Sequence, residues 1–242
     1  MELKWWKSLY DQQMADLFLH REKEQSDQEI SLLEDLLQLQ HGDHILDQCC
    51  GTGSLSIPLA DRGYRVTGVD IMPKYIQQAR DDSKSDMTVF HCADAAEFVA
   101  SSCDAGFNWW TGFGYGSDQQ SKDMLGCAFR SLRTGGRFLL DFVNAPGIIR
   151  HFQPSSHLER NGISLTREST IDWHGGRLQQ RWIFKEHDEK RVVDSSVRFY
   201  QPHELVILFQ EAGFVEIQLF GDRKKQALTI DSMRCICVGR KP

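Results

Sequence analysis

A glycine turn followed by an acidic residue is the stretch of this sequence best suited to hold a small ligand. Gly51 and Gly53 follow the short apolar run 45–46, and apolar residues recur at helical spacing over 55–60. Glycine lets the backbone turn tightly beside a ligand, and the N-terminus of the next helix carries a partial positive charge. Asp70 ends the following apolar run, where a carboxylate can accept hydrogen bonds from both hydroxyls of a ribose. The spacing predicts strand, turn, helix and strand, with a nucleotide-like ligand at the turn.

The same alternation of strands and helices continues on the C-terminal side and must position the ligand-binding loops. A strand is expected at 87–91, another from Cys103 into a glycine-rich turn, a helix at 124–132 and a strand at 137–143. After residue 200, Pro202 and Gly213 bound a helix, and two strands follow at 215–220 and 234–238. In an open sheet of this kind the ligand crevice lies at the carboxyl ends of the strands.

Two segments depart from this alternation. Apolar residues recur close to the helical period from Trp5 to Phe18 and again from Ile30 to Leu39, which predicts an N-terminal helical cap. Between 145 and 200, turn residues at 161–162, 175–176 and 188–189 separate strand-like runs over 163–173, 178–184 and 192–200. We therefore expect an antiparallel β-meander inserted after the fifth strand.

Composition narrows the class of protein. The net charge of −6 comes with no stretch that concentrates Lys and Arg, which disfavours a nucleic-acid partner. The seven cysteines are odd in number and scattered, and they lack the spacing of metal ligands, so reduced thiols and no metal are expected. With no signal-peptide pattern and no apolar run near the roughly 18 residues of a membrane helix, we expect a cytoplasmic protein without a membrane partner.

Three motifs resemble one family. The run Asp47-Gln48-Cys49-Cys50-Gly51-Thr52-Gly53 resembles the S-adenosylmethionine (SAM) signature of class I methyltransferases, usually Asp-x-Gly-x-Gly-x-Gly, with Cys49 in place of the first glycine. Residues 103–115 are similar to a stretch of a small-molecule branch of that family, with Trp109 and Trp110 replacing smaller apolar residues. Residues 132–141 resemble its Leu-Lys-Pro-Gly-Gly-Arg-Phe-Leu-Leu-Asp, with Thr134 in place of proline. The expected fold is α/β, with a Rossmann-like seven-stranded sheet whose last strand is antiparallel.

The resemblance implies a SAM site built from residues that match the family pattern. Asp70 would bind the ribose, Asp94 the adenine amino group, and the Ala95 amide a ring nitrogen; the other reading of Asp94 is the N-cap of a helix over 95–100. The full set of expected cofactor contacts is Tyr10, Asp47, Cys49, Gly51, Gly53, Asp70, Ile71, Asp94, Ala95, Asn108 and Trp109. One of Trp109 and Trp110 should face the ligand while the other packs, because adjacent strand residues point to opposite faces.

The acceptor side is expected beside the glycine-rich turn and under the insertion, where relatives often shape their acceptor pocket. The reaction would be an in-line displacement of the sulfonium methyl by an N, O or C nucleophile of a small molecule. A base is needed only when the acceptor must lose a proton, and Tyr115 is the catalytic candidate, ahead of His151, Tyr200 and His203. The expected substrate contacts are Trp110, Phe113, Asn144, His151 and Tyr200.

The whole chain is expected to be a single methyltransferase domain spanning 1–242. Its parts are a helical cap at 1–42, a SAM-binding core at 43–144, an antiparallel insertion at 145–200, through which a homodimer could pair, and the C-terminal part of the sheet at 201–242. Three alternatives stay open. They are a protein or RNA methyltransferase, a SAM-binding module without catalysis, and, on the glycine turn and Asp70 alone, a nicotinamide-dependent oxidoreductase.

Overall fold

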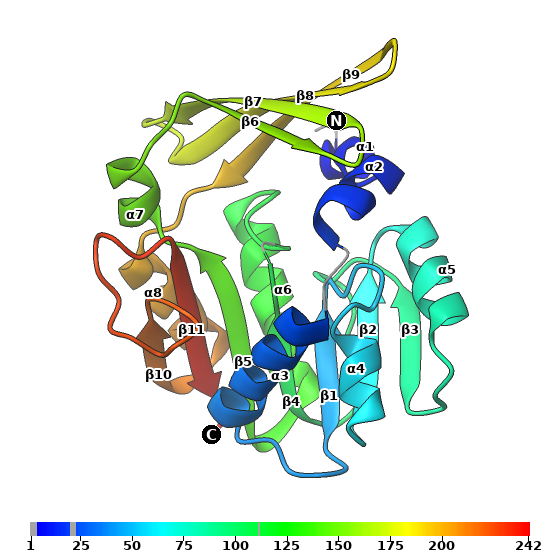
Figure 1. The fold of residues 1–242 in the computed structure, drawn as a ribbon. Coiled ribbons are helices and arrows are strands. Elements are labelled where there is room, and N and C mark those ends of the chain that lie inside the picture. The colour runs from blue at the N-terminus through cyan, green and yellow to red at the C-terminus, as the bar shows by residue number, and fades with distance from the viewer. Residues whose placement is uncertain (1–3, 20–22, 111) are drawn as a thin grey trace.

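A seven-stranded sheet forms the centre of the protein, whose computed structural model describes residues 4–19, 23–110 and 112–242. The strand order is β10-β11-β5-β4-β1-β2-β3 (Figure 1). Strands β1 to β5 run parallel, whereas β11 is antiparallel to both β5 and β10. This confirms the expected Rossmann-like sheet with an antiparallel last strand. The bounds are β1 His44–Gln48, β2 Arg65–Asp70, β3 Thr88–Cys92, β4 Cys103–Asn108, β5 Leu132–Val143, β10 Val215–Phe220 and β11 Arg234–Arg240.

Helices cover both faces of this sheet because successive strand residues alternate between two cores. On β5, Leu140 belongs to the core with α6 (Asp118–Ser131) and α8 (Pro202–Ala212), whereas Leu139 belongs to the core with α3 (Lys23–Leu37). The short α4 (Ser56–Asp61) follows the glycine turn, and α5 (Pro73–Asp82) packs on Phe90 of β3. Helix α8 begins at Pro202 and ends at Gly213, whose φ is +105°, as predicted.

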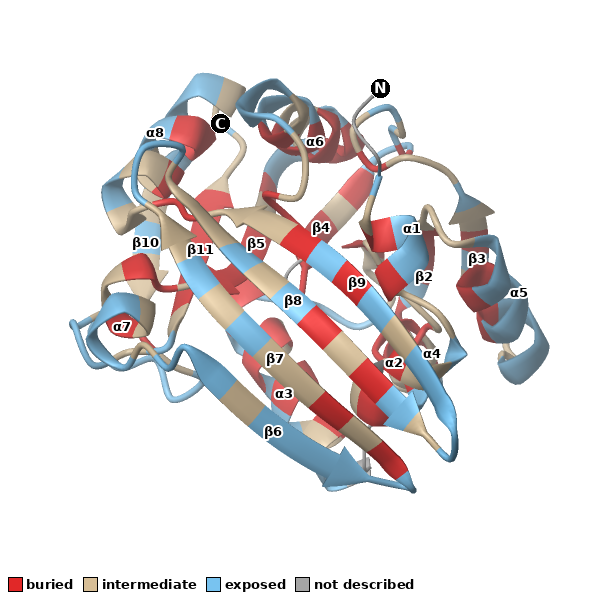
Figure 2. Ribbon diagram, turned by 90° about the horizontal axis from the view of Figure 1, so that it is seen from above, coloured by how far each residue is buried: buried red, intermediate tan, exposed pale blue. Residues whose placement is uncertain are grey.

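The insertion forms a second, four-stranded antiparallel sheet in the order β6-β7-β8-β9, which lies above the central sheet (Figure 2). It follows the short helix α7 (Ala145–Arg150) and comprises β6 Ser155–Arg160, β7 Ile163–Asp172, β8 Arg177–Glu186 and β9 Glu189–Arg198. The β6–β7 turn has positive φ at both Asn161 and Gly162, which matches the twist of a tight hairpin. The meander is thus confirmed, with β6 as a strand that we did not expect, because its sequence is exposed and shows no apolar alternation.

The N-terminal segment packs mainly on the insertion. It forms α1 (Trp6–Leu9), α2 (Gln12–Met14) and a π-helical turn η1 (Ala15–Leu19), and its Leu9, Met14 and Leu17 share a core with residues of β7, β8 and β9. Arg191 of β9 reinforces this contact by binding Asp11 at 3.0 Å and the Ser8 carbonyl at 2.9 Å. Residues 4–19 and the insertion therefore lie together above the carboxyl ends of the parallel strands (Figure 1).

Two local expectations were wrong. Residues 95–97 form a turn where a helix over 95–100 was expected, and Asp94 Oδ1 accepts the Ala96 amide at 3.0 Å within that turn. Strand β5 begins at Leu132, directly after α6, instead of at 137 as expected, and it passes through Gly135, whose φ of +81° distorts the strand without ending it.

Candidate active site

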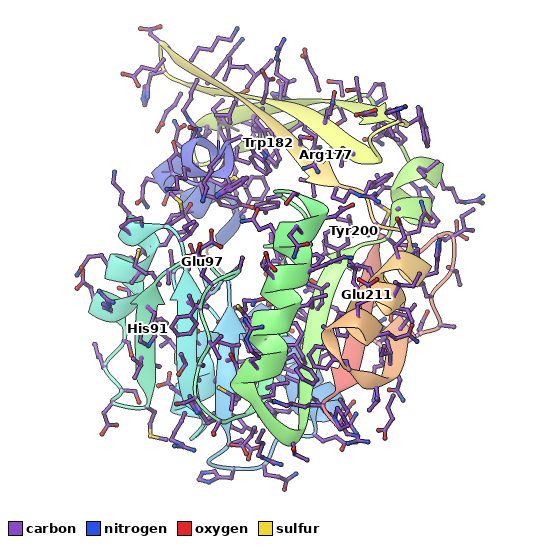
Figure 3. The ribbon with its side chains drawn as sticks, turned by 180° about the vertical axis from the view of Figure 1, so that it is seen from behind. His91, Glu97, Arg177, Trp182, Tyr200 and Glu211 are labelled. Carbon is purple, nitrogen blue, oxygen red and sulfur yellow. The ribbon has the colours of Figure 1, made fainter. Side chains whose placement is uncertain are left out.

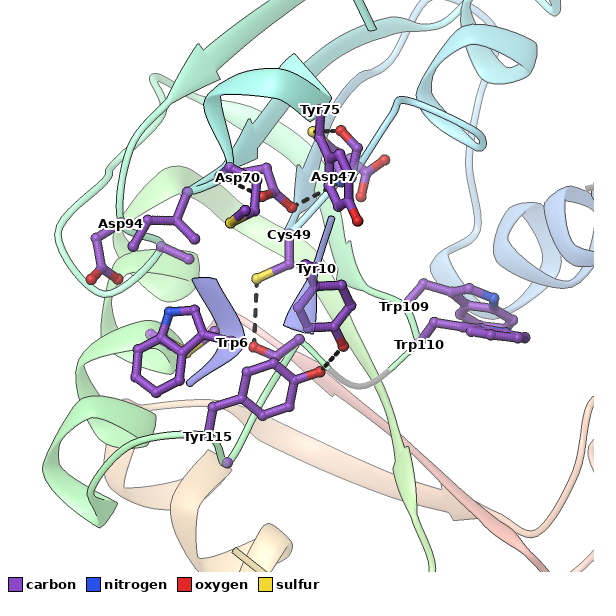
Figure 4. A pocket seen from close by; sticks show the side chains of 18 of the residues that line it. Trp6, Tyr10, Asp47, Cys49, Asp70, Tyr75, Asp94, Trp109, Trp110 and Tyr115 are labelled. Atoms are coloured by element: carbon purple, nitrogen blue, oxygen red, sulfur yellow. Dashed lines mark hydrogen bonds between the residues drawn. The ribbon is translucent and has the colours of Figure 1, made fainter. Parts of the chain in front are cut away.

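A pocket with an empty volume of about 1050 Å³ lies at the carboxyl ends of β1, β2 and β4 (Figure 4). The N-terminal segment and the glycine-rich turn after β4 form its other walls. Its lining brings together eleven of the residues that the sequence singled out. These are Tyr10, Asp47, Cys49, Gly51, Asp70, Ile71, Asp94, Ala95, Trp109, Trp110 and Tyr115.

The loop after β1 has left-handed backbone at three positions. Cys49, Gly51 and Gly53 have φ values of +66°, +56° and +77°. The Cys49 and Cys50 amides both donate to the Val69 carbonyl, at 2.8 and 3.0 Å, which ties the loop to β2. The resembled signature has glycine at position 49 for a conformational reason, because a side chain with φ near +60° costs about 1–2 kcal/mol.

Cys49 occupies this strained position and fills the space beside Gly112. A Cβ on Gly112 would lie 2.5 Å from the Cys49 Cβ and 2.7 Å from its Sγ, so the pair accommodates a side chain on one residue only. Burial, reinforced by Asp70 and Asp47, raises the pKa of the Cys49 thiol well above its usual range. Cys49 is thus a neutral thiol at neutral pH and not a nucleophile.

Asp70 holds the loop and still offers acceptor sites to a ligand. Its Oδ2 accepts the Gly51 amide and its Oδ1 the Met72 amide, both at 2.9 Å. An ionised carboxylate has about four acceptor positions, so about two remain for a ligand. Burial raises the Asp70 pKa, and the backbone N–H groups oppose that shift by stabilising the ionised form.

Two further carboxylates enter the pocket from neighbouring strand ends. Asp47, at the end of β1, is 3% exposed and its Oδ2 accepts the Ser56 hydroxyl at 2.6 Å. Asp94 follows β3 and lies 3.6 Å from the Lys4 ammonium. Among the described residues that line the pocket, none is Lys, Arg or His. These carboxylate acceptors therefore suit a ligand with positive charge and with hydroxyl or amino groups that donate hydrogen bonds, and SAM has these features.

Aromatic rings form the other wall. The hydroxyls of Tyr10 and Tyr115 share a hydrogen bond, and their rings stack with centroids 6.1 Å apart (Figure 4). Trp5 contacts Tyr115 at 4.7 Å, and Tyr75 meets Tyr10 edge-on at 6.5 Å. Tyr75 also donates to the Asp11 carbonyl at 2.8 Å, which joins the N-terminal segment to α5. The arrangement brings Tyr115 and Tyr10 together across the pocket from the glycine turn.

Trp109 and Trp110 both line the pocket, and Trp109 is also packed in the core that contains α3, so which of the two rings faces the ligand stays a prediction. Strand β4 ends at Asn108, and Trp110 has φ +64°, so the two residues no longer alternate as in a strand. The Trp109 ring is buried, with the Arg223 guanidinium 5.5 Å from its centroid. Its Nε1 has no hydrogen-bond partner among the described residues.

Seven of the sequence candidates lie outside the pocket lining, and one of them, His203, is exposed on α8. Gly53 packs against Phe90 and Ala79, which a Cβ there would approach at 3.1 and 3.2 Å. Asn108 is buried beneath the loop and donates to Gln48 Oε1 at 3.2 Å and to Cys49 Sγ at 3.6 Å. Phe113 is a core residue, packed on Phe142 with ring centroids 5.8 Å apart.

The other three lie near the insertion. Asn144 donates to the carbonyls of Thr229 and Ser232 at 3.0 and 2.7 Å, and it thereby fixes the loop before β11. His151 is about half exposed and lies 3.5 Å from Asp231. Tyr200 is buried and donates to Asp118 at 2.7 Å.

Several lining residues carried no chemical signal in the sequence. Trp6 and Tyr75 read as packing residues of amphipathic helices, and they do pack while also lining the pocket. Gln120 and Ser121 come from the first turn of α6, whose N-terminus could be recognised only from the Ser117 cap. The capping pattern Ser117 to Gln120 was the available clue.

A model of a methyltransferase domain family matches residues 45–136, which contain the glycine turn, Asp70, Asp94 and β4. This part of the chain is thus similar to a methyltransferase domain. Among the described residues, no helix is long and apolar enough to cross a membrane. In the part of the chain that the structure describes, no group of three or more His, Cys, Asp or Glu side chains is arranged to hold a metal.

Solved structures share this fold over nearly the whole chain. The CcbJ methyltransferase from Streptomyces caelestis superposes with a TM-score of 0.78 at 20% identity, covering 94% of this chain and 96% of the other. SAM-bound CalS10, an amino pentose methyltransferase from Micromonospora echinaspora, gives 0.67 at 18% identity, covering 96% and 98%.

Curated relatives match over smaller shares of their own length. The SAM-dependent Diels-Alderase iccD from Talaromyces variabilis is 28% identical over 187 residues, which is 75% of this chain and 56% of that protein. The human tRNA (uracil-5-)-methyltransferase homolog A is 36% identical over 72 residues, 28% of this chain and 12% of that protein. The chain thus spans about half, or much less, of the curated relatives that it matches.

Proposed function

We propose that this protein transfers a methyl group from SAM to a nucleophilic atom of a small molecule held beside Tyr10 and Tyr115. The observation that carries the proposal is the pocket itself. Three carboxylates from neighbouring strand ends face it from one side, and a pair of hydrogen-bonded tyrosines faces it from the other. The structural neighbours CcbJ and CalS10, both methyltransferases by name, support the same activity.

The residues present fit SAM by their chemistry. Asp70 retains acceptor capacity for the ribose hydroxyls, Asp94 and Ala95 offer an acceptor and a donor to adenine, and Asp47 lies nearest the glycine turn. SAM supplies a methyl group that its sulfonium has already activated. The protein's own contribution is to hold the acceptor in line and exclude water, which supplies roughly 7–11 kcal/mol in well-oriented reactions.

The charge of the pocket favours a neutral or cationic acceptor, and we propose an amine. An acceptor carrying a carboxylate or phosphate would meet three carboxylates without a basic side chain among the described lining residues. A neutral amine attacks through its lone pair and needs no base beforehand. The Tyr10 and Tyr115 hydroxyls can accept its N–H groups, while the surrounding rings favour the positive charge that develops on nitrogen.

We also propose that residues 1–242 form one domain, with the cap, core, insertion and C-terminal part described above. We propose that the protein is located in the cytoplasm. The seven free cysteines accord with a reducing compartment.

A homodimer could form through the exposed strand β6, which pairs with β7 on one side only among the described residues. Light scattering of the purified protein, with Leu158→Lys on β6 as the variant, tests the dimer.

The experiment is a SAM-dependent acceptor screen with two readouts. Calorimetry measures SAM binding, and mass spectrometry measures S-adenosylhomocysteine and methylated product for matched sets of amines, phenols and carboxylic acids. We expect binding, turnover with amines, and at least tenfold lower turnover in Tyr115→Phe.

The alternatives are separated by applying the same two readouts to RNA, protein and NADH as well. Methyl incorporation into RNA or protein alone would contradict a small-molecule acceptor. SAM binding with conversion of a substrate but no S-adenosylhomocysteine would instead indicate a role like that in the name of iccD, with SAM as a bound cation. Binding of NADH without SAM would indicate an oxidoreductase.

A further inference from the structure

The main chain around Tyr115 is held by one arginine of the insertion. Arg177 Nη2 donates to the Tyr115 carbonyl at 2.9 Å and lies 3.5 Å from the Gly114 carbonyl, and its Nη1 donates to the Gly116 carbonyl at 3.1 Å. The guanidinium thus contacts three successive carbonyls of the turn. Figure 3 shows Arg177 in the insertion, above the end of α6.

The same guanidinium is anchored on the neighbouring strand. Its Nε donates to the Ser196 hydroxyl and its Nη2 to the Ser196 carbonyl, each at 2.7 Å. Arg177 begins β8 and Ser196 lies in β9, two strands that pair along their whole length. The guanidinium that binds the turn is therefore itself fixed by two paired strands, β8 and β9.

Arg198 of β9 also binds this turn. The Arg198 amide donates to the Gly114 carbonyl at 2.7 Å, and the Arg198 guanidinium binds Asp118 at 3.2 Å. Asp118 is the first residue of α6, so the turn is fixed at its start and just beyond its end. Arg177 holds the middle, where Tyr115 lies.

The turn needs such support because of its sequence. Gly112, Gly114 and Gly116 alternate through it, and Gly114 has φ +77°. Glycine gives an isolated segment many accessible conformations, so the position of the Tyr115 ring depends on what holds the backbone. A planar guanidinium offers several donors in fixed directions, which a lysine ammonium cannot reproduce.

We infer that Arg177 is a positioning residue for Tyr115, through which the insertion sets the acceptor side of the pocket. Arg177 acts through the backbone and leaves the SAM-binding carboxylates untouched. The inference that this affects catalysis rests on the proposed function, whereas the inference that it orders the turn does not.

The test compares Arg177→Lys with Arg181→Lys in the full chain. Arg181 lies on the same strand but pairs with exposed Asp194, at 2.8 Å, so it controls for the loss of an arginine from β8. Hydrogen exchange measured by mass spectrometry on residues 112–118 reports order in the turn without any acceptor. We expect exchange there to rise by roughly tenfold in Arg177→Lys and to stay unchanged in Arg181→Lys.

The second readout is kinetic, with a Tyr115→Phe background. Arg177→Lys should lower kcat/KM about tenfold or more, while SAM affinity changes less than about twofold. In Tyr115→Phe the same substitution should have a much smaller effect, because the group it positions is gone.

The outcomes separate the two ideas. Unchanged exchange at 112–118 overturns the inference whatever the activity, and so does an equal kinetic effect with and without the Tyr115 hydroxyl. Raised exchange together with SAM binding but no methyl transfer to any acceptor keeps the ordering role and overturns the proposed function.

Discussion

Placing a side chain on Gly112 should destabilise the protein only while Cys49 keeps its own. The Ala Cβ would lie 2.5 Å from the Cys49 Cβ, and because a Cβ cannot rotate away, the backbone must shift. Overpacking of this kind costs roughly 1–3 kcal/mol. Once Cys49 is glycine, the nearest remaining atom is Asn108 Oδ1 at 3.3 Å, and the cost of Gly112→Ala should fall below about 0.5 kcal/mol.

Cys49→Gly itself should be close to neutral. Removing the strain at φ +66° should stabilise the protein by about 1–2 kcal/mol. Losing the buried thiol should destabilise it by about 1 kcal/mol, and the greater entropy of glycine in the unfolded chain by about 0.5–1 kcal/mol more. Urea unfolding of the four proteins in the cycle measures the coupling energy, which we expect to be about 1–3 kcal/mol. Additive effects, with coupling under about 0.5 kcal/mol, would refute the idea that Cys49 and Gly112 share one space.

Three further predictions concern the loop and its acid. Asp70→Asn should weaken SAM binding about 10- to 100-fold in calorimetry, since charge-assisted hydrogen bonds to the ribose are lost; unchanged affinity would contradict the assignment. Because burial raises the Asp70 pKa, its ionised form is lost at a higher pH than for an exposed aspartate. SAM affinity should therefore fall as the pH drops toward the raised pKa of Asp70, and the pH dependence of SAM affinity should weaken in Asp70→Asn. Gly53→Ala should cost about 1–3 kcal/mol in urea unfolding, more than the control Gly42→Ala, whose φ is also positive but whose Cβ meets open space.

The carboxylate side of the pocket, where we propose that SAM binds, could be predicted from the sequence because its residues lie at or just after strand ends. Asp47, Asp70 and Asp94 each end or closely follow a parallel strand, and such ends meet at one edge of the sheet. Cys49 shows the limit of this reasoning. Its left-handed backbone explains why the motif has glycine there, and its contact with Gly112 involves a residue 63 positions later.

The acceptor side could be predicted only in part. Phe113 and Tyr200 are aromatic residues near expected loops, but an aromatic that lines a pocket and one that fills a core have the same sequence pattern. Here the two rings pack on each other, with centroids 5.8 Å apart, and on Phe142. Asn144 and His151 were likewise chosen for their position after β5, whereas their partners lie in the loop before β11. No local pattern reveals such pairings.

We expect cofactor binding and acceptor positioning to be separable, because the two sides of the pocket rest on different parts of the chain. The acceptor side is continuous: the N-terminal segment packs on the insertion, and the insertion holds the Tyr115 turn through Arg177. It meets the loop after β1 where Cys49 contacts Gly112, α5 where Tyr75 donates to Asp11, and Asp94 where the Lys4 ammonium lies 3.6 Å away. Arg177 contacts the turn and Ser196 and none of the three pocket carboxylates, so we expect its substitution to lower turnover more than it lowers SAM affinity.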